Sequence, residues 1–174
     1  MKKCFVILFV ALWCLTACNS VKPNTNEKSS PDTQYYSEKE LQEISDYSGN
    51  KNQIMGQYSG GFLVKQNTCS TLSYANKDYS TVLVLYLDES DQKVFSAMYH
   101  PIHPWTVFEE LEIGTSMEEV KEIDPYGGYL YGLGRMSISN HCTTDGYYIS
   151  IEYSADGFLK EVKNQGYIFQ RTDE

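Results

Sequence analysis

A histidine, a cysteine and an aspartate lie close together at His141, Cys142 and Asp145, and these residue types together can activate a thiol as a nucleophile. His141 and Cys142 are adjacent, however, so in a strand their side chains would point to opposite faces. The chain also has no Gly-x-Ser-x-Gly sequence, which would place a serine nucleophile on a sharp turn. We therefore predict no catalytic residues, and keep a hydrolase that uses His141 as a remote alternative.

Two further histidines, His100 and His103, are three residues apart and would suit a metal ion if acidic or cysteine ligands stood beside them. Their neighbours are Pro101 and Pro104 instead, and two prolines this close oppose both helix and sheet pairing. Residues 100–105 are therefore predicted to be a stiff connector that binds no metal and no cofactor.

Tyrosine occurs 15 times and is densest in residues 126–136, where it alternates with glycine. A tyrosine ring offers a flat apolar face with a hydroxyl group, which suits contact with a sugar or with another protein. The competing interpretation is that these tyrosines half-bury themselves over a sheet. The candidate binding residues are Tyr129, Tyr131, Arg135, His141, Asp145 and Tyr148.

The chain begins with Lys2 and Lys3, followed by an apolar stretch that ends in Leu15-Thr16-Ala17-Cys18. This order resembles the signal peptide of bacterial lipoproteins with its lipobox. The resemblance implies cleavage before Cys18, a diacylglycerol on its sulfur with palmitate as an acyl chain, and anchoring at the extracytoplasmic face of the cell membrane. A membrane-spanning helix is the alternative, but about 15 apolar residues are fewer than the roughly 20 that it needs. Residues 1–17 are thus the predicted signal peptide, and residues 18–36 a lipidated, flexible tether.

The charge balance argues against nucleic acid as a partner. The whole chain carries a formal net charge of −9, and removal of the two lysines of the signal peptide leaves 12 basic and 23 acidic residues, hence −11. A surface of this sign repels the phosphates of nucleic acids and anionic lipid headgroups.

The sequence contains two versions of one stretch. Asn-x-Cys-Ser/Thr-Thr occurs at residues 67–71 and again at residues 140–144, and Tyr86 is answered by Tyr153 after 67 residues. Internal similarity of this kind predicts two tandem units of the same fold.

We place these units at residues 37–99 and 106–174, on either side of the connector. Each has one cysteine in its copy of the motif, Cys69 and Cys142. Outside the cytoplasm a disulfide between them would persist, whereas two buried, unpaired cysteines would simply pack as small apolar residues. Both interpretations stay open, because the sequence does not give the Cα separation that a disulfide requires.

Both units show helix signals before their strands. Ser37 with Glu40 and Ser116 with Glu119 have the spacing of a capping box, and the pair one residue earlier is the alternative to the second box. Alternating or continuous apolar runs predict strands at residues 62–64, 70–74, 81–87, 94–98, 129–131, 136–139, 147–153 and 158–162, with a last edge strand at 167–170. The expected fold is α+β: two pseudo-repeats, each a helix-loop-helix packed on a three- to four-stranded antiparallel sheet.

Residues 108–125, FEELEIGTSMEEVKEIDP, are similar to the pattern of the small outer-membrane-assembly lipoproteins of the SmpA/OmlA group. Two such units in tandem resemble the β-lactamase inhibitor protein. The string from Ile123 to Gly157 resembles exported lipoproteins of clostridia most closely, and this likeness covers residues 108–163. The resemblances imply the fold and, more broadly, protein binding. Only the pattern of elements matches the inhibitor protein, and its contact residues are not carried over.

The leading prediction is a lipid-anchored, non-enzymatic module whose two units form one sheet surface that contacts a protein of the cell envelope. The alternative from another class is recognition of a cell-wall glycan or peptide through residues 126–136.

Overall fold

The computed structural model describes residues 34–65, 70–133 and 136–169. The predicted signal peptide, Cys18 and most of the tether lie outside the described residues, as do Cys69 and Arg135. The chain forms two compact units, one of Met1–Lys77 with Leu83–Met98 and the other of Asp78–Val82 with Tyr99–Glu174. Within the described ranges, no helix is both long enough and apolar enough to cross a membrane.

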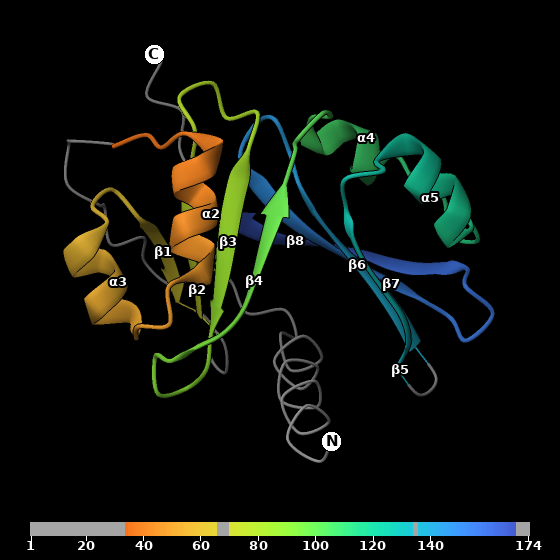
Figure 1. Ribbon diagram of the computed structural model, residues 1–174. Coiled ribbons are helices and arrows are strands. Elements are labelled where there is room, and N and C mark those ends of the chain that lie inside the picture. Colours follow the sequence, from red (N-terminus) through yellow and green to blue (C-terminus); the bar gives the residue numbers. More distant parts are fainter. Residues whose placement is uncertain (1–33, 66–69, 134–135, 170–174) are drawn as a thin grey trace. The chain divides into compact units, whose positions relative to one another are not determined.

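Unit one begins with two short helices, α2 (Glu38–Asp46) and α3 (Lys51–Gln57) (Figure 1). A capping box starts each helix, formed by Ser37 with Glu40 and by Asn50 with Gln53. These bonds satisfy backbone N–H groups that have no partner within the helix. The predicted box of Ser37 and Glu40 is thus confirmed.

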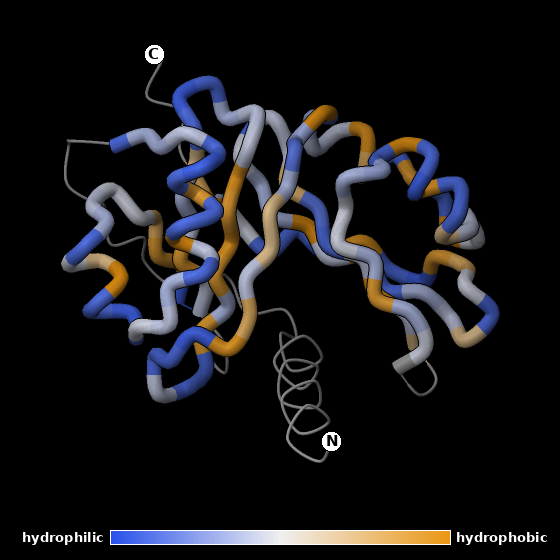
Figure 2. Tube along the Cα trace, in the orientation of Figure 1, coloured by the Kyte–Doolittle hydropathy of each residue, from blue (hydrophilic) through white to orange (hydrophobic). Residues whose placement is uncertain are grey.

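A four-stranded sheet follows, in which the strands are neighbours in their chain order. Its members are β1 (Phe62–Lys65), β2 (Ser70–Ala75), β3 (Val82–Leu87) and β4 (Lys93–Tyr99). The strand β3 has the sequence VLVLYL, is buried along its whole length, and forms one of the hydrophobic stretches in Figure 2.

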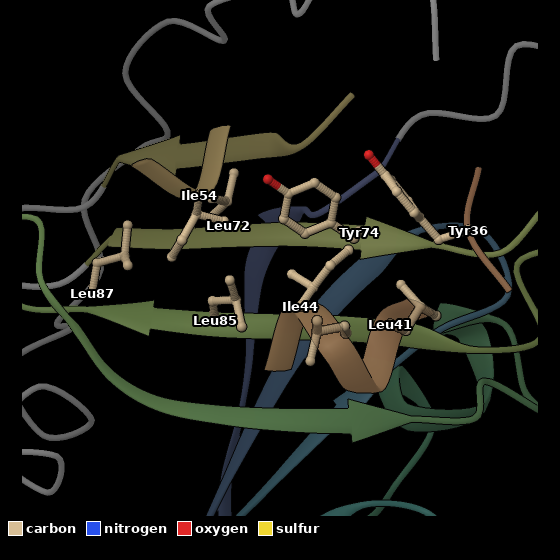
Figure 3. Close-up of a cluster of buried hydrophobic side chains, with 9 residues drawn as sticks. Tyr36, Leu41, Ile44, Ile54, Leu72, Tyr74, Leu85 and Leu87 are labelled. Atoms are coloured by element: carbon tan, nitrogen blue, oxygen red, sulfur yellow. The ribbon is translucent and has the colours of Figure 1, made fainter. Parts of the chain in front are cut away.

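The core of unit one brings residues of the helices and of the sheet together (Figure 3). Its buried members are Tyr36, Leu41, Ile44, Ile54, Leu72, Tyr74, Leu83, Leu85 and Leu87. The ring of Tyr36 meets the rings of Tyr58 and Tyr74 edge to face, at centroid distances of 6.2 and 5.7 Å. This core is apolar apart from tyrosine hydroxyl groups.

Unit two repeats the order of elements (Figure 1). Its helices are α4 (Trp105–Glu109) and α5 (Met117–Ile123), and its sheet is β5 (Gly128–Leu133), β6 (Met136–Cys142), β7 (Tyr147–Tyr153) and β8 (Leu159–Tyr167). Every strand pairs antiparallel with the next. The predicted box of Ser116 with Glu119 starts α5, so the alternative one residue earlier is wrong. The mixture of helices with two antiparallel sheets confirms an α+β fold, whereas helix-loop-helix packing on each sheet stays a prediction.

The expected separate edge strand at residues 167–170 is wrong for the part that the structure describes. Tyr167 is the last residue of β8, and Ile168 and Phe169 lie beyond the strand. The backbone N–H of Ile168 donates to the carbonyl of Gly146 at 2.9 Å, and the ring of Phe169 stacks on Tyr79 at 4.4 Å. Ile168 is held by one backbone hydrogen bond and Phe169 by ring stacking, so neither residue forms a further strand.

The two units correspond in a register that the sequence motif did not predict. An isolated bridge joins Asn50 to Gln92 in unit one, and the same bridge joins Ser116 to Phe158 in unit two, 66 residues later at both ends. The Asn-x-Cys motif does not follow this register. In unit one it runs into the start of β2 at Ser70, whereas in unit two it covers the end of β6 at Cys142.

The predicted match between Tyr86 and Tyr153 is also wrong. Tyr153 belongs to the core cluster of unit two, whereas Tyr86 is not part of the core cluster of unit one and packs on Phe95 at 5.4 Å. Because neighbouring strand residues point to opposite faces, a match that is off by one residue exchanges a core position for a position on the other face.

Candidate functional site

The six predicted binding residues do not form one site. Tyr131 and Asp145 are exposed, Tyr129 is half-buried, and His141 and Tyr148 are buried, while Arg135 lies outside the described residues. His141 is paired with Ile149 across the sheet, so it shares a face with Ile149. The adjacent Tyr148 therefore points to the opposite face.

Asp145 is not the partner of His141 that its proximity in the sequence suggests. Its two carboxylate oxygens lie 3.1 and 3.3 Å from the backbone nitrogen of Trp105, the first residue of α4. The preceding residue, Pro104, has no side chain that could cap this helix. Asp145 thus supplies the acceptor that a capping residue normally provides.

The actual partners of His141 are Asp124 and Ser139, and the three residues form a buried chain of hydrogen bonds. Asp124 Oδ2 lies 2.7 Å from His141 Nδ1, and His141 Nε2 lies 2.8 Å from Ser139 Oγ. The Ser139 hydroxyl is in turn 2.8 Å from the hydroxyl of Tyr153. His141, Ser139 and Tyr153 are each 0 % exposed, and Asp124 is 3 % exposed.

A neutral His141 gives every donor of this chain an acceptor. The Tyr153 hydroxyl donates to Ser139, Ser139 donates to Nε2, and the N–H at Nδ1 donates to the Asp124 carboxylate. The other oxygen of Asp124 accepts the backbone N–H of Tyr126 at 3.0 Å. With the bonds in these directions, each of the three donors has one acceptor within the buried chain.

The order Asp–His–Ser is that of a hydrolase triad, but the set is closed to substrate in this structure. A serine nucleophile must reach a carbonyl carbon from a surface that the substrate can touch. The hydroxyl of Ser139 is instead engaged by both His141 and Tyr153 in the core. Burial also raises the pKa of Tyr153 to about 12, so its hydroxyl keeps its proton and remains a donor at neutral pH. These four side chains act here as a bridge between α5 and the sheet.

Cys142 does not complete a thiol dyad with His141. It is paired with Tyr148, on the face of the sheet opposite to His141. Burial raises the pKa of its thiol well above the usual value, which disfavours the reactive thiolate. The predicted bridge to Cys69 involves a residue outside the described residues and stays a prediction.

Tyr129 is part of the support of this network and not an open binding residue. Its hydroxyl donates to the carbonyl oxygens of Asp124, the C-cap of α5, at 2.5 Å and of Val120, in the last turn of this helix, at 3.2 Å. Its ring meets the His141 ring edge to face at 5.5 Å. Burial raises the pKa of Tyr129 far above its usual value.

Glycine is required where the chain passes His141. A Cβ atom added at Gly127 would lie 2.6 Å from His141 Nδ1, closer than real Cβ atoms approach other atoms. Unit one has the same arrangement, because a Cβ at Gly61 would lie 2.7 Å from the ring of Tyr74. The positions of Tyr74 and His141 therefore correspond, so at this place the offset between the units is 67 residues, one more than at Gly61 and Gly127 and at the two bridges.

Sequence reasoning missed Asp124, Ser139 and Tyr153 as partners of His141. One signal was present, because Ser139 and His141 alternate in a strand and must share a face. The positions of unit one that correspond to Ser139 and His141 are Leu72 and Tyr74, members of an apolar core. A buried polar chain is thus a feature of unit two and not a requirement of the repeated fold.

Two of the exposed aromatic side chains of unit two lie at the edge strand β5 and just before it. Tyr126 is 51 % exposed and Tyr131 is 53 % exposed. The hydroxyl of Tyr131 donates to Glu118 of α5 at 3.3 Å, and the amine of Lys121 lies 6.0 Å from its ring centroid. Tyr131 is therefore held by α5 but remains open to solvent.

Comparisons with known proteins find few matches to this chain. No protein-family model matches the chain, and no curated protein matches it significantly. A search of solved structures finds a protein of Streptococcus mutans named "putative beta-lactamase inhibitor protein". It is 15 % identical, the alignment covers 80 % of this chain and 91 % of that chain, and the TM-score is 0.24. At this TM-score the likeness is too slight to indicate a function for this chain.

Proposed function

We propose that this chain is a lipid-anchored module at the extracytoplasmic face of a bacterial membrane, where it binds a protein of the cell envelope and performs no covalent chemistry. The closed Asp124–His141–Ser139 set carries the non-enzymatic part of the proposal. Asp124, His141 and Ser139 are sealed in the core of unit two, while aromatic side chains are open at its surface.

The surface that we assign to the partner is centred on Tyr131 and the exposed face of α5. Tyrosine is among the side chains that contribute most to protein interfaces, because it buries a large apolar area and loses little conformational freedom. The neighbouring helix exposes the carboxylates of Glu118, Glu119 and Glu122. A partner with basic residues around an apolar depression fits this surface, since opposite charges steer association and set its salt dependence.

Anchoring through Cys18 has a direct test. The change Cys18→Ser removes the sulfur that would carry the lipid, so the chain is expected to move from the membrane pellet to the soluble fraction after cell lysis and centrifugation. Mass spectrometry of the parent chain should find an N-terminal peptide that begins at Cys18 with a diacylglycerol attached. A Cys142→Ser chain is the control and should stay in the pellet. Unchanged membrane association of Cys18→Ser would rule out the lipid anchor.

Partner binding is expected to depend on Tyr131. The full chain, immobilised in detergent, should retain an envelope protein in a saturable manner, and Tyr131→Ala should weaken this binding by roughly tenfold, which corresponds to about 1.4 kcal/mol. Phe95→Ala is a matched control, because Phe95 is an exposed aromatic residue of β4 in unit one, at 48 % exposure, and belongs to neither α5 nor β5. Equal binding by the two variants would contradict the assignment, and retention of wall fragments without any protein would favour glycan recognition instead.

A further inference from the structure

A second aromatic group lies in unit two, at the start of α4, and it takes no part in the surface around Tyr131. Tyr147 and Tyr167 are directly opposite each other on β7 and β8, and their rings stack with centroids 4.3 Å apart and planes 27° apart. Trp105, the first residue of α4, meets the Tyr147 ring at a centroid distance of 6.3 Å, with the two ring planes tilted by 50°. Tyr167 is 39 % exposed, and Trp105 and Tyr147 are half-buried.

Polar groups beside these rings have hydrogen-bond donors and acceptors that other described residues do not use. The hydroxyl groups of Tyr147 and Tyr167 are 2.6 Å apart in an exposed position. Their mutual bond uses one of their two hydrogens, so the pair keeps one donor and several acceptor lone pairs. Asp145, also exposed, accepts a single N–H from the described residues, that of Trp105, and retains lone pairs on both oxygens. Bonding to Tyr167 is the largest cause that raises the pKa of Tyr147, to about 12.

The repeated fold does not require this group. Trp105 and Glu38 are each the first residue of the first helix of their unit, and Phe108 and Leu41, three residues later, are the buried positions of the two helices. Glu38 is an exposed, charged residue in unit one. A large aromatic side chain at this place is therefore specific to unit two, as the polar chain at His141 is.

The ring geometry restricts the class of ligand. A cation held between two aromatic faces needs each ring centroid within about 6 Å on either side of it. Tyr147 and Tyr167 contact each other directly and leave no such space. The carboxylate of Asp145 and the overall net charge of −9 disfavour an anion. An uncharged ligand with one flat apolar face and many hydroxyl groups fits the rings, the paired hydroxyls and the carboxylate together.

We propose that Trp105, Tyr147, Tyr167 and Asp145 form a binding site for a neutral saccharide, separate from the protein-binding surface around Tyr131. The apolar face of a sugar ring packs on the exposed ring of Tyr167, beside the half-buried rings of Tyr147 and Trp105. Its hydroxyl groups bond with the paired tyrosine hydroxyls and with the free lone pairs of Asp145. For an extracytoplasmic chain the ligand class is an uncharged glycan, presented by a wall or by a cell surface.

Trp105 makes the site observable. The chain has two tryptophans, and the other, Trp13, lies in the predicted signal peptide. The full chain with Trp13→Phe, kept in a detergent without a sugar headgroup, is titrated with the β-1,4-linked trimer of N-acetylglucosamine while Trp105 emission is recorded. We expect a saturable change in emission. Tyr167→Ala should weaken binding by about tenfold or more, since it removes the most exposed ring.

Two variants separate binding from folding. Tyr126→Ala removes a tyrosine of similar exposure outside the site and should bind the trimer as the parent does. Tyr167→Phe keeps the ring and loses only the hydroxyl, so its affinity should fall between those of the parent and Tyr167→Ala. The proposal is overturned if the trimer and a β-1,4-linked glucose trimer both leave the emission unchanged at millimolar concentration, or if folded Tyr167→Ala binds as the parent does.

The experiments on protein binding at Tyr131 and on saccharide binding at Tyr167 can each contradict one proposal without affecting the other. Loss of protein capture in Tyr131→Ala with unchanged saccharide binding leaves this site intact. Loss of saccharide binding in Tyr167→Ala with unchanged capture supports this site and does not affect the surface around Tyr131.

Discussion

Replacing His141 with alanine is expected to lower the free energy of unfolding of unit two by about 4 kcal/mol. The change removes a fully buried ring that packs on Phe108 at a centroid distance of 4.9 Å and on Tyr129 at 5.5 Å. It also leaves Asp124 and Ser139 without their shared partner in the core. Unfolding in urea, followed through the emission of Trp105, reports on unit two because Trp105 is its only tryptophan.

His103→Ala is the matched control for this experiment. His103 is half-buried, and within the described residues its side chain makes one hydrogen bond, from Nε2 to the carbonyl of Ile123 at 3.0 Å. Its removal should lower the free energy of unfolding by about 1 kcal/mol. If the two variants were destabilised equally, the buried chain would not be the main support of unit two.

Replacing Asp124 with alanine is expected to be destabilising by about 4 kcal/mol, and with asparagine by about half as much. The Asp124 carboxylate accepts one hydrogen from His141 and one from the backbone of Tyr126, at 2.7 and 3.0 Å. Alanine leaves the buried N–H of His141 and the part-buried N–H of Tyr126 without this acceptor. Asparagine has a single acceptor oxygen, so it serves one donor and turns its own N–H groups towards the other.

Urea unfolding of Asp124→Ala and Asp124→Asn, measured side by side, tests whether alanine lowers the free energy of unfolding more than asparagine does. Equal stability of Asp124→Asn and the parent chain would mean that the two donors do not depend on two acceptors, and that the directions assigned to these hydrogen bonds are wrong. Glu119→Gln changes a carboxylate at the other end of the same helix, in the exposed capping box, and is expected to cost at most about 1 kcal/mol.

Much of the fold could be predicted because its signals are local. Ser37 and Ser116 start helices through a glutamate three residues later, and both boxes are present. The run from Val82 to Leu87 forms a strand because its branched and apolar side chains suit a buried, pleated surface. Each of these signals lies within a few residues of the chain.

The site could not be predicted because its contacts are not local. Asp124 and His141 are 17 residues apart, and only the pairing of β5 with β6 brings the end of α5 to the His141 ring. Asp145 was the acid closest in sequence, but it binds the backbone of Trp105, 40 residues away. The motif around Cys69 and Cys142 suggested a register for the repeat. One copy of the motif leads into the start of β2 and the other covers the end of β6, so their residues are not structurally equivalent.

The contact between Gly127 and the His141 ring constrains how such units can diverge. The His141 ring fills the space that a side chain at position 127 would need, so the residue types at the two positions depend on each other. The same holds for Gly61 and Tyr74. Neither member can change alone without a clash or a void, so descendants of one ancestral unit should exchange ring for ring while the glycine is kept, or lose both together. This chain has both kinds of ring: the phenol ring of Tyr74 faces Gly61, and the imidazole ring of His141 faces Gly127. A glycine followed by a ring 13 or 14 residues later is accordingly the pattern by which further copies of this unit can be sought.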